Sequence, residues 1–474
     1  MSAAALWMGV RLWLQRWQRE DPVVFAAIGA GPEYLEVLVA TLVRGGTFVA
    51  GHPEQGFEHL RTEILQWQPD FVVLDRHSSF TIPGYRICDE VNEHRNALLL
   101  GRIHGYEDLQ EKHPLRQFHS SERRIILSTS GTTGGQRKWA ILSDYNLFSV
   151  LRTHLPRLQM KGATVLSVLP WNHAFGLILD LIPALLRART IVRDIPGDAS
   201  RFLAVQKRFG IDYVSAVPAV FDRWLKDDSV KDVIGSFTGG LLGGASVNSQ
   251  LANALRGSSF RVGYGQTEAS PGITLGNAGD FKQGFIGNVL GCEVDISQGT
   301  LHYRGPNVCT AMVNFTESPG IQFSESTRVA LEDAMHSLTI GIQKRDSGNW
   351  QDTGDIVQEV EGGFRYLGRA NDNFKLSNGR FLDAIAWEKA LEESTGYHCY
   401  IVSFDGGFKV YFAAPDHESG KQSFPTIKLQ ARQSLGKLGE YIRGMEFLQA
   451  RDIPRSSKGD VNRSALSNPK AGGS

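Results

Sequence analysis

The stretch RIILSTSGTTGGQRK, residues 124–138, places glycines and hydroxyl side chains directly after a short apolar run. The apolar run predicts a buried strand, and ligands of open α/β sheets bind where such strands end at their carboxyl side. Glycines let backbone N–H groups approach phosphate oxygens, hydroxyls add donors, and a nearby cation neutralises charge. The stretch therefore predicts a phosphate-binding loop, although a plain polar loop is an equally good interpretation of this motif taken alone.

The spacing within this loop differs from that of P-loop kinases and GTPases. Their pattern requires a second glycine five residues after the first, followed by Lys. Gln136 stands five residues after Gly131, and Trp139 stands five residues after Gly134. The sequence therefore disfavours an ordinary P-loop enzyme.

Strand-like apolar runs alternate with helical patterns on both sides of the loop. PVVFAAIGA (22–30) and DFVVLD (70–75) precede it, and ATVLSVLP (163–170) and IDYVSAVP (211–218) follow it. This alternation predicts an α/β fold in which stacked βαβ sheets are covered by helices.

Two later changes in pattern predict the domain organisation. Short strands and turn glycines predict a small β-rich subdomain at about 285–365. A last segment with its own helix and hairpin has the size of an independent α+β domain. We therefore expect an N-terminal domain over 1–370 and a C-terminal domain over 371–474.

Composition excludes several classes of protein. The 474 residues carry a formal net charge of +0, which gives no electrostatic reason to expect nucleic acid or an anionic membrane as a partner. The four cysteines are far apart and form no CxxC pair, so neither a disulfide framework nor a zinc site is indicated, and a cytoplasmic setting is expected. Apolar residues at helical spacing over 6–17 predict an amphipathic packing helix rather than a signal peptide. No apolar stretch has the length of a membrane span.

Two more motifs point to a nucleotide. In GYGQTEASPG (263–272), Glu268 offers a carboxylate for Mg²⁺, Thr267 a hydroxyl, and Tyr264 an aromatic face. In DTGDI (352–356), Asp355 can accept hydrogen bonds from both hydroxyls of a ribose. Each motif alone is more typical of an ordinary turn, but together and in this order they favour a nucleotide site.

With LLGGAS (241–246), LGRANDNFK (367–375) and IPRSSKGDVNR (453–463), these motifs resemble those of the AMP-forming adenylating enzymes. That superfamily contains acyl- and aryl-CoA synthetases, peptide-synthetase adenylation domains and luciferases, and the pattern here is closest to acyl and aryl carboxylate ligases. The resemblance implies that ATP and Mg²⁺ convert a carboxylate to an acyl-adenylate, which is then transferred to the thiol of CoA or of a carrier protein's phosphopantetheine. It also implies that the C-terminal domain is a mobile lid.

The resemblance implies roles for individual residues. The phosphate loop would comprise Ser130, Gly131, Thr132, Thr133, Gly134 and a cation, which is Arg137, or Lys138 if one residue is inserted. The nucleoside would be contacted by Gly243, Gly244, Ala245, Tyr264, Gly265, Asp355 and Arg369. Glu268 would bind Mg²⁺, Thr267 would contact the α-phosphate or the substrate carboxylate, and His173 would lie at the mouth of the acyl site.

The closing motif departs from the family pattern. An ungapped alignment places Asp460 where the family has the lysine that bridges carboxylate and α-phosphate, and Lys458 stands two positions earlier. A carboxylate would repel a phosphate, so we expect Lys458 to fill the catalytic role. The hinge aspartate of the family is Asn371 here. A homologue that binds nucleotide or acyl-adenylate without full catalysis remains the alternative.

The acyl-site segment LPWNHAFGL (169–177) indicates the class of acid. No Asp lies between Pro170 and Ile178 to pair with an α-ammonium group, which favours a non-amino carboxylic acid. Segments 171–176, 217–221 and 269–273 are expected to form a largely apolar and aromatic pocket, which suits an aryl or medium-sized acyl group. A stand-alone acyl-adenylate former or a luciferase-like oxidase is the other enzyme alternative.

Overall fold

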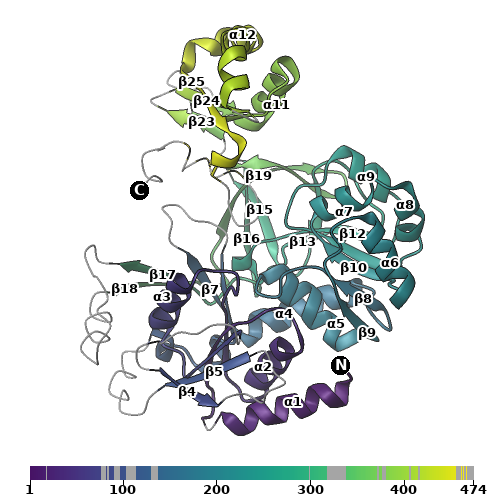
Figure 1. The fold of residues 1–474 in the computed structure, drawn as a ribbon, viewed down its shortest axis with the longest axis vertical. Helices are drawn as coiled ribbons and strands as arrows, with labels where there is room; N and C mark the ends of the chain where they lie inside the picture. Colours follow the sequence, from purple (N-terminus) through teal and green to yellow (C-terminus); the bar gives the residue numbers. More distant parts are fainter. Residues whose placement is uncertain are drawn as a thin grey trace.

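The computed structural model describes residues 1–17, 19–75, 82, 85–89, 97–102, 114–129, 137–297, 299–317, 338–370, 373–375, 381–404, 407–414, 417–454, 461, 463 and 466. Its strands form one nine-stranded sheet, one eleven-stranded sheet, a three-stranded sheet near the C-terminus and a two-stranded ribbon. Helices pack around the two large sheets (Figure 1). The predicted α/β fold class is confirmed.

The nine-stranded sheet contains the strand that leads into the predicted phosphate loop. In spatial order its strands are β18 (Leu338–Lys344), β17 (Ala311–Glu317), β7 (Lys138–Leu142), β6 (Ile125–Ser128), β2 (Thr47–Ala50), β1 (Val23–Ala27), β3 (Phe71–Asp75), β5 (Ala97–Arg102) and β4 (Tyr85–Asp89). The central strands β6, β2, β1 and β3 are parallel, and the outer pairs are antiparallel. All five residues of β1 are buried, as expected for a parallel strand covered on both faces.

The eleven-stranded sheet carries the other predicted nucleotide motifs. Its order is β15 (Glu293–Ser297), β16 (Thr300–Arg304), β19 (Gln351–Val360), β20 (Gly363–Arg369), β14 (Phe285–Val289), β13 (Thr274–Leu275), β12 (Phe260–Tyr264), β11 (Gly239–Leu242), β10 (Tyr213–Ala216), β8 (Thr164–Ser167) and β9 (Thr190–Arg193). The five strands β8 to β12 are parallel, and antiparallel pairing begins between β12 and β13. The predicted β-rich subdomain thus contains strands of both large sheets, because β17 and β18 belong to the first.

The helices between these strands begin and end at recognisable signals. They are α1 (Ala3–Arg16), α2 (Pro32–Val43), α3 (Phe57–Trp67), α4 (Asp144–His154), α5 (Ile182–Arg187), α6 (Ala199–Phe209), α7 (Pro218–Trp224), α8 (Asp228–Gly235) and α9 (Ser249–Leu255). Ser143 and Asn146 form a reciprocal capping box at the start of α4. Asp198 caps α6, which ends at Gly210 in the left-handed conformation. The N-terminal packing helix is confirmed: α1 buries Val10 and Trp13, and the Trp13 indole donates to Glu36 of α2 at 3.1 Å.

The helical segment that follows β8 begins as a π-helix and not as a regular α-helix. The π-helix η5 (Phe175–Leu181) precedes α5, and the N–H of Ile182 donates to the carbonyl of Leu177, five residues back. Pro183 lacks an N–H donor and crowds the preceding turn, which disfavours regular α-helical pairing there.

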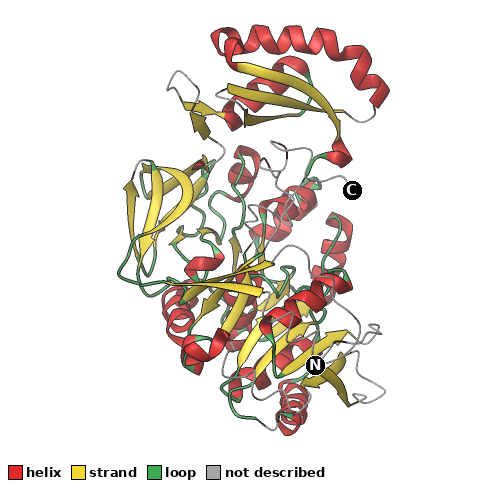
Figure 2. Ribbon diagram, turned by 90° about the vertical axis from the view of Figure 1, so that its left-hand side faces the viewer, coloured by secondary structure: helices red, strands yellow, loops and turns green. Residues whose placement is uncertain are grey.

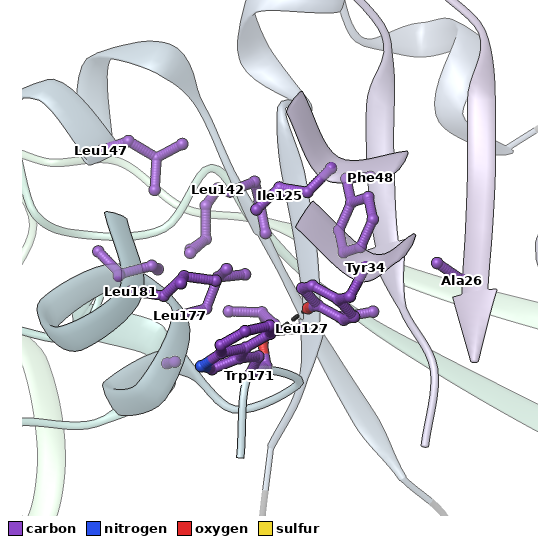
Figure 3. Packing of buried hydrophobic residues seen from close by; sticks show 14 of the residues in the cluster. Ala26, Tyr34, Phe48, Ile125, Leu127, Leu142, Leu147, Trp171, Leu177 and Leu181 are labelled. Carbon is purple, nitrogen blue, oxygen red and sulfur yellow. Dashed lines mark hydrogen bonds between the residues drawn. The ribbon is translucent and has the colours of Figure 1, made fainter. Parts of the chain in front are cut away.

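A hydrophobic core joins this π-helix to the first large sheet. Figure 3 shows Leu177 and Leu181 facing Leu127, Ile125 and other core residues. Tyr34 of α2 packs beside Trp171, and its hydroxyl donates to the Trp171 carbonyl at 2.7 Å. Burial of the phenol raises the pKa of Tyr34, which keeps this donor protonated. The segment 170–181 is thereby fixed against the sheet.

The C-terminal part of the chain has its own core. The ribbon β21 (Asn373–Lys375) and β22 (Phe381–Asp383) leads to α11 (Ala384–Thr395), the antiparallel pair β23 (Cys399–Phe404) and β24 (Gly407–Ala414), then α12 (His417–Leu435) and β25 (Ile442–Gln449). Helices cover this small sheet, and the unit lies at one end of the molecule (Figures 1 and 2). Its main core cluster contains only residues from Leu382 onward. Among the described residues, no helix combines the length and apolarity needed to cross a membrane.

Candidate active site

A buried carboxylate brings together three residues that sequence reasoning assigned from separate motifs. Strands β19 and β20 pair Asp355 with Arg369, and the Arg369 Nε lies 2.9 Å from Asp355 Oδ1. The Tyr264 hydroxyl, at the end of β12, donates to Asp355 Oδ2 at 2.6 Å. Asp355 is only 3% exposed. Burial, together with the charge of Asp355, raises the pKa of Tyr264 well above its usual value, so the phenol remains a donor.

The predicted adenine-contacting glycines lie at the same edge of the sheet as Tyr264. Parallel pairing aligns Leu242 of β11 with Val262 of β12, so Gly243 and Gly244 follow β11 beside the end of β12. Gly244 has φ +79°, and a Cβ there would lie 3.3 Å from Val217 Cγ1. A positive φ and this close neighbour suit glycine. Ala245, which follows, is exposed.

Thr267 and Glu268 lie in the short 3₁₀ turn η6 (Thr267–Ala269), just beyond Tyr264 and Gly265. The backbone of this turn is fixed by a hydrogen bond from the Cys309 N–H to the Glu268 carbonyl at 2.9 Å. The Thr267 and Glu268 residues are partly exposed. One accessible carboxylate fits a Mg²⁺ ion that takes its other ligands from phosphate oxygens and water.

A chain of hydrogen bonds links the predicted acyl segment to the strand before the phosphate loop. His52 follows β2, its Nδ1 lies 2.8 Å from Asn172 Nδ2, and its Nε2 lies 2.8 Å from Ser128 Oγ. The His52 and His173 rings are 5.0 Å apart. Burial, with the nearby charge of Arg137 and the neighbouring His173, lowers the pKa of His52 to about 3, so the ring is neutral near pH 7. The sequence did not predict a role for His52, although this residue lies two positions after the buried strand β2, at the edge where Ser128 ends β6.

The two candidate cations of the phosphate loop differ in environment. Arg137 NH1 lies 3.6 Å from Glu63 Oε1 of α3, whose side chain is 9% exposed. Burial raises the pKa of Glu63 to about 7, even though Arg137 and a hydrogen bond with Gln55 act in the opposite direction. Lys138 begins β7 and is exposed. Residues Ser130, Gly131, Thr132, Thr133 and Gly134, and also Lys458 and Asp460, lie outside the described residues.

The predicted walls of the acyl pocket divide into two groups. Phe175 and Val217 approach the glycines after β11, because a Cβ on Gly243 would lie 3.4 Å from Phe175 Cε1 and one on Gly244 3.3 Å from Val217. Trp171 and Phe221 are instead 3% and 0% exposed and belong to two core clusters. These two aromatic rings are therefore part of the hydrophobic core and anchor the segments 171–176 and 217–221 to it.

The family follows from a comparison of the whole sequence with known proteins. A family model described as "AMP-binding enzyme" matches residues 12–309, more than half of the chain. The protein is a member of the AMP-binding enzyme family. The matched range contains the Tyr264, Thr267 and Glu268 segment and both glycines after β11.

Individual members of the AMP-binding enzyme family resemble this chain at low identity. Probable 4-coumarate–CoA ligase 3 of Dictyostelium discoideum is 21% identical over 326 residues, which is 60% of this chain and 59% of that protein. The match therefore spans less than two thirds of that relative. ATP-bound MatB from Rhodopseudomonas palustris is 19% identical with a TM-score of 0.68, covering 98% of this chain and 92% of that one. O-succinylbenzoate coenzyme A synthetase (MenE) from Bacillus subtilis, solved with ATP and magnesium ion, is 17% identical with a TM-score of 0.66, covering 98% and 94%. These structures share the fold of this AMP-binding enzyme family member.

Proposed function

We propose that this protein is an AMP-forming acid–thiol ligase. It activates a non-amino carboxylic acid, aryl or acyl, with ATP and then transfers the acyl group to the thiol of CoA or of a carrier protein's phosphopantetheine. In the first step a carboxylate oxygen bonds to the α-phosphorus and pyrophosphate leaves. In the second step the thiol sulfur bonds to the acyl carbon, AMP leaves, and the thiol proton is released.

The observation that carries the proposal is the buried acceptor formed by Asp355. Its two oxygens are already oriented by Tyr264 and Arg369, so a ribose would meet a carboxylate that needs little reorganisation. The glycines after β11 lie beside the end of β12, which carries Tyr264, and their lack of side chains would let a flat base approach the backbone there. The likeness to proteins named as CoA ligases and synthetases supports the thiol step.

Other residues of the chain supply charge and orientation. Glu268 would hold Mg²⁺, which lowers the charge repulsion between phosphates and the attacking carboxylate when bound. Thr267, one residue away, would donate to the α-phosphate or the substrate carboxylate, and Lys138 or Arg137 would face the phosphate loop 130–134. His173, held near His52 and on the segment anchored through Trp171, would lie at the mouth of the acyl site. Lys458, in the C-terminal lid domain 371–474, would bridge carboxylate and phosphate.

The specific alternative is a homologue that binds AMP or an acyl-adenylate without full catalysis. It is favoured by Asp460, which stands where the family pattern has a lysine. Carboxylate-dependent exchange of pyrophosphate into ATP, measured over a panel of aryl and acyl acids, distinguishes the two. Exchange with one class of acid, followed by a thioester when CoA or a carrier is added, supports the ligase. Tight AMP binding without exchange for any acid supports the alternative.

A further inference from the structure

A cavity lies on the eleven-stranded sheet, away from the Asp355 carboxylate. Its volume is about 260 Å³, and its polar lining consists of Arg157, Arg261, Asn277 and Asn288. The rest of the wall is formed by Leu275, Gly276, Val289, Leu290 and Gly362. Arg157 ends the short helix η4 (Leu155–Arg157), and Arg261 lies on β12. Arg261 precedes Tyr264 by three residues, so their Cα atoms are about 10 Å apart along the strand. The cavity and the predicted ribose site are therefore different places on the sheet.

The two arginines are not paired with carboxylates. Arg157 NH1 donates to the Thr153 carbonyl at 2.9 Å, and Arg261 NH1 donates to the Gly276 carbonyl at 3.0 Å. Within the described part of the chain neither guanidinium forms an ion pair, and the buried Nε of Arg261 has no hydrogen-bond partner. Asp280, whose carboxylate lies near Gly362, is itself paired with Lys282 at 3.3 Å. Among the described residues, the lining of the cavity thus holds two positive charges and no carboxylate.

This arrangement is electrostatically unfavourable when nothing else is bound. Burial is the main cause that lowers the pKa of Arg261; the neighbouring Tyr213 acts in the opposite direction, and the charge of Arg157 adds to the lowering. The charged guanidinium is therefore penalised at this position. An anion in the cavity would reverse that penalty, since charge-assisted hydrogen bonds to guanidinium are among the stronger polar contacts in proteins. The side-chain oxygen of Asn288 accepts from the Val289 N–H at 2.8 Å, which leaves its amide NH₂ as a further donor.

We infer that the cavity between Arg157 and Arg261 is a binding site for a phosphoryl group. Two guanidinium charges match a dianion, and donors from separate elements, the helix η4 and the strand β12, can surround a tetrahedral group from different directions. The volume lies below the roughly 300–1,000 Å³ typical of pockets for drug-sized ligands. The cavity thus suits free phosphate or the phosphate end of a larger molecule that extends into solvent. The inference does not depend on the proposed ligase activity.

Calorimetric titration with inorganic phosphate, at constant ionic strength, tests this site in the full-length protein. The Arg157→Gln and Arg261→Gln variants are each expected to lower phosphate affinity at least about tenfold, because each removes charge-assisted donors. Arg256→Gln is the matched control, since Arg256 is exposed, bonded to Asn253 and not part of the cavity lining. Its affinity for phosphate should equal that of the wild type.

The outcomes separate the site from general surface charge. No phosphate binding by the wild type, or an equal loss in Arg256→Gln, overturns the inference. If Arg261→Gln does not fold, the phosphate affinity of Arg157→Gln decides alone, because Arg157 is exposed and its substitution should not affect folding. Wild-type affinity in that variant overturns the inference. A parallel titration with phosphoethanolamine, a phosphomonoester without a nucleobase, shows whether the bound phosphoryl group is free phosphate or part of a larger molecule. Tighter binding than phosphate, with the same dependence on both arginines, assigns the site to a larger ligand, and equal or weaker binding assigns it to free phosphate.

Discussion

At the scale of single residues, Asp355 is the side chain whose surroundings are most specific. It is a buried carboxylate with one neutral hydrogen-bond donor, Tyr264, and one ion-pair partner, Arg369. Tyr264 and Arg369 contact different oxygens of this carboxylate, so each can be tested separately. The tyrosine is the better target, because its substitution leaves the ion pair in place.

Tyr264→Phe is expected to weaken AMP binding about tenfold while the protein stays folded, because it removes one hydrogen bond to a charged group and keeps the ring. Calorimetric titration with AMP measures the change. Tyr145→Phe is the control, since Tyr145 is 65% exposed and lies on α4. An unchanged affinity for AMP in Tyr264→Phe would contradict the assignment of this residue to the nucleoside site.

His52 gives a prediction about pH at the same scale. Its pKa in the folded protein is about 3, against an ordinary value of 6.5, so the unfolded chain binds this proton first. The stability contributed by the neutral ring is fully present above pH 6.5 and is lost as the pH falls from 6.5 toward about 3. Denaturant unfolding of His52→Gln should therefore show a shallower loss of stability over that range than the wild type. His59→Gln, at an exposed position on α3, should keep the wild-type slope, and an identical slope in all three proteins would show that His52 is not held neutral.

At the scale of elements, local pattern predicted the strands that are buried on both faces but not the edges of the sheets. The run VVFAA reads as a strand because it is apolar throughout, and β1 is buried at every residue. The pairing of β17 with β7, which places Ala311 opposite Ile141, is carried by contacts far apart in the sequence. One such contact is the packing of Phe315 against Trp67 of α3, with ring centroids 4.9 Å apart. No local periodicity encodes which sheet an added hairpin joins.

The candidate site also contains residues that local sequence motifs predicted and contacts that they did not. Tyr264, Asp355 and Arg369 were predicted because each lies in a recognisable motif, and the structure brings these three together. The link from His52 to Asn172 and Ser128 was not predicted, since it joins three elements through single side chains. Such a link has no motif of its own. Only the shared sheet edge, where β2 and β6 both end, could have indicated it.

Gly265, in the turn between β12 and η6, is expected to fix the position of that turn. A Cβ on Gly265 would lie 1.5 Å from the Pro271 carbonyl oxygen, which is backbone and cannot swing away. Gly265→Ala should therefore displace the turn that carries Thr267 and Glu268 and destabilise the protein by at least about 2 kcal/mol. Denaturant unfolding measures this effect. Gly197→Ala is the matched control, because a Cβ there meets nothing within 4 Å, and equal stability of the two variants would show that the turn adapts.

At the scale of the whole molecule, the hydrophobic clusters separate the chain into two groups of residues. The clusters that contain the two large sheets end with Phe364, and those of the C-terminal unit begin with Leu382. The partly buried ion pair between Arg463 and Glu388, at 2.7 Å, also stays within the C-terminal unit. Asp355 and Tyr264 thus belong to one group, and Lys458 falls within the sequence range of the other, which lets binding and chemistry be separated by experiment.

A chain truncated after residue 370 is expected to bind AMP within about threefold of the full-length affinity, because Asp355, Tyr264 and Arg369 all remain. The same fragment should lose carboxylate-dependent pyrophosphate exchange, and so should full-length Lys458→Ala, since each lacks the cation proposed to bridge carboxylate and α-phosphate. Asp460→Asn is the control at the neighbouring position and should retain exchange, because removing a negative charge near phosphate does not oppose the reaction. Exchange by the fragment would place the chemistry entirely within 1–370. Wild-type exchange by Lys458→Ala together with an inactive fragment would instead assign the bridging cation to another residue beyond 370.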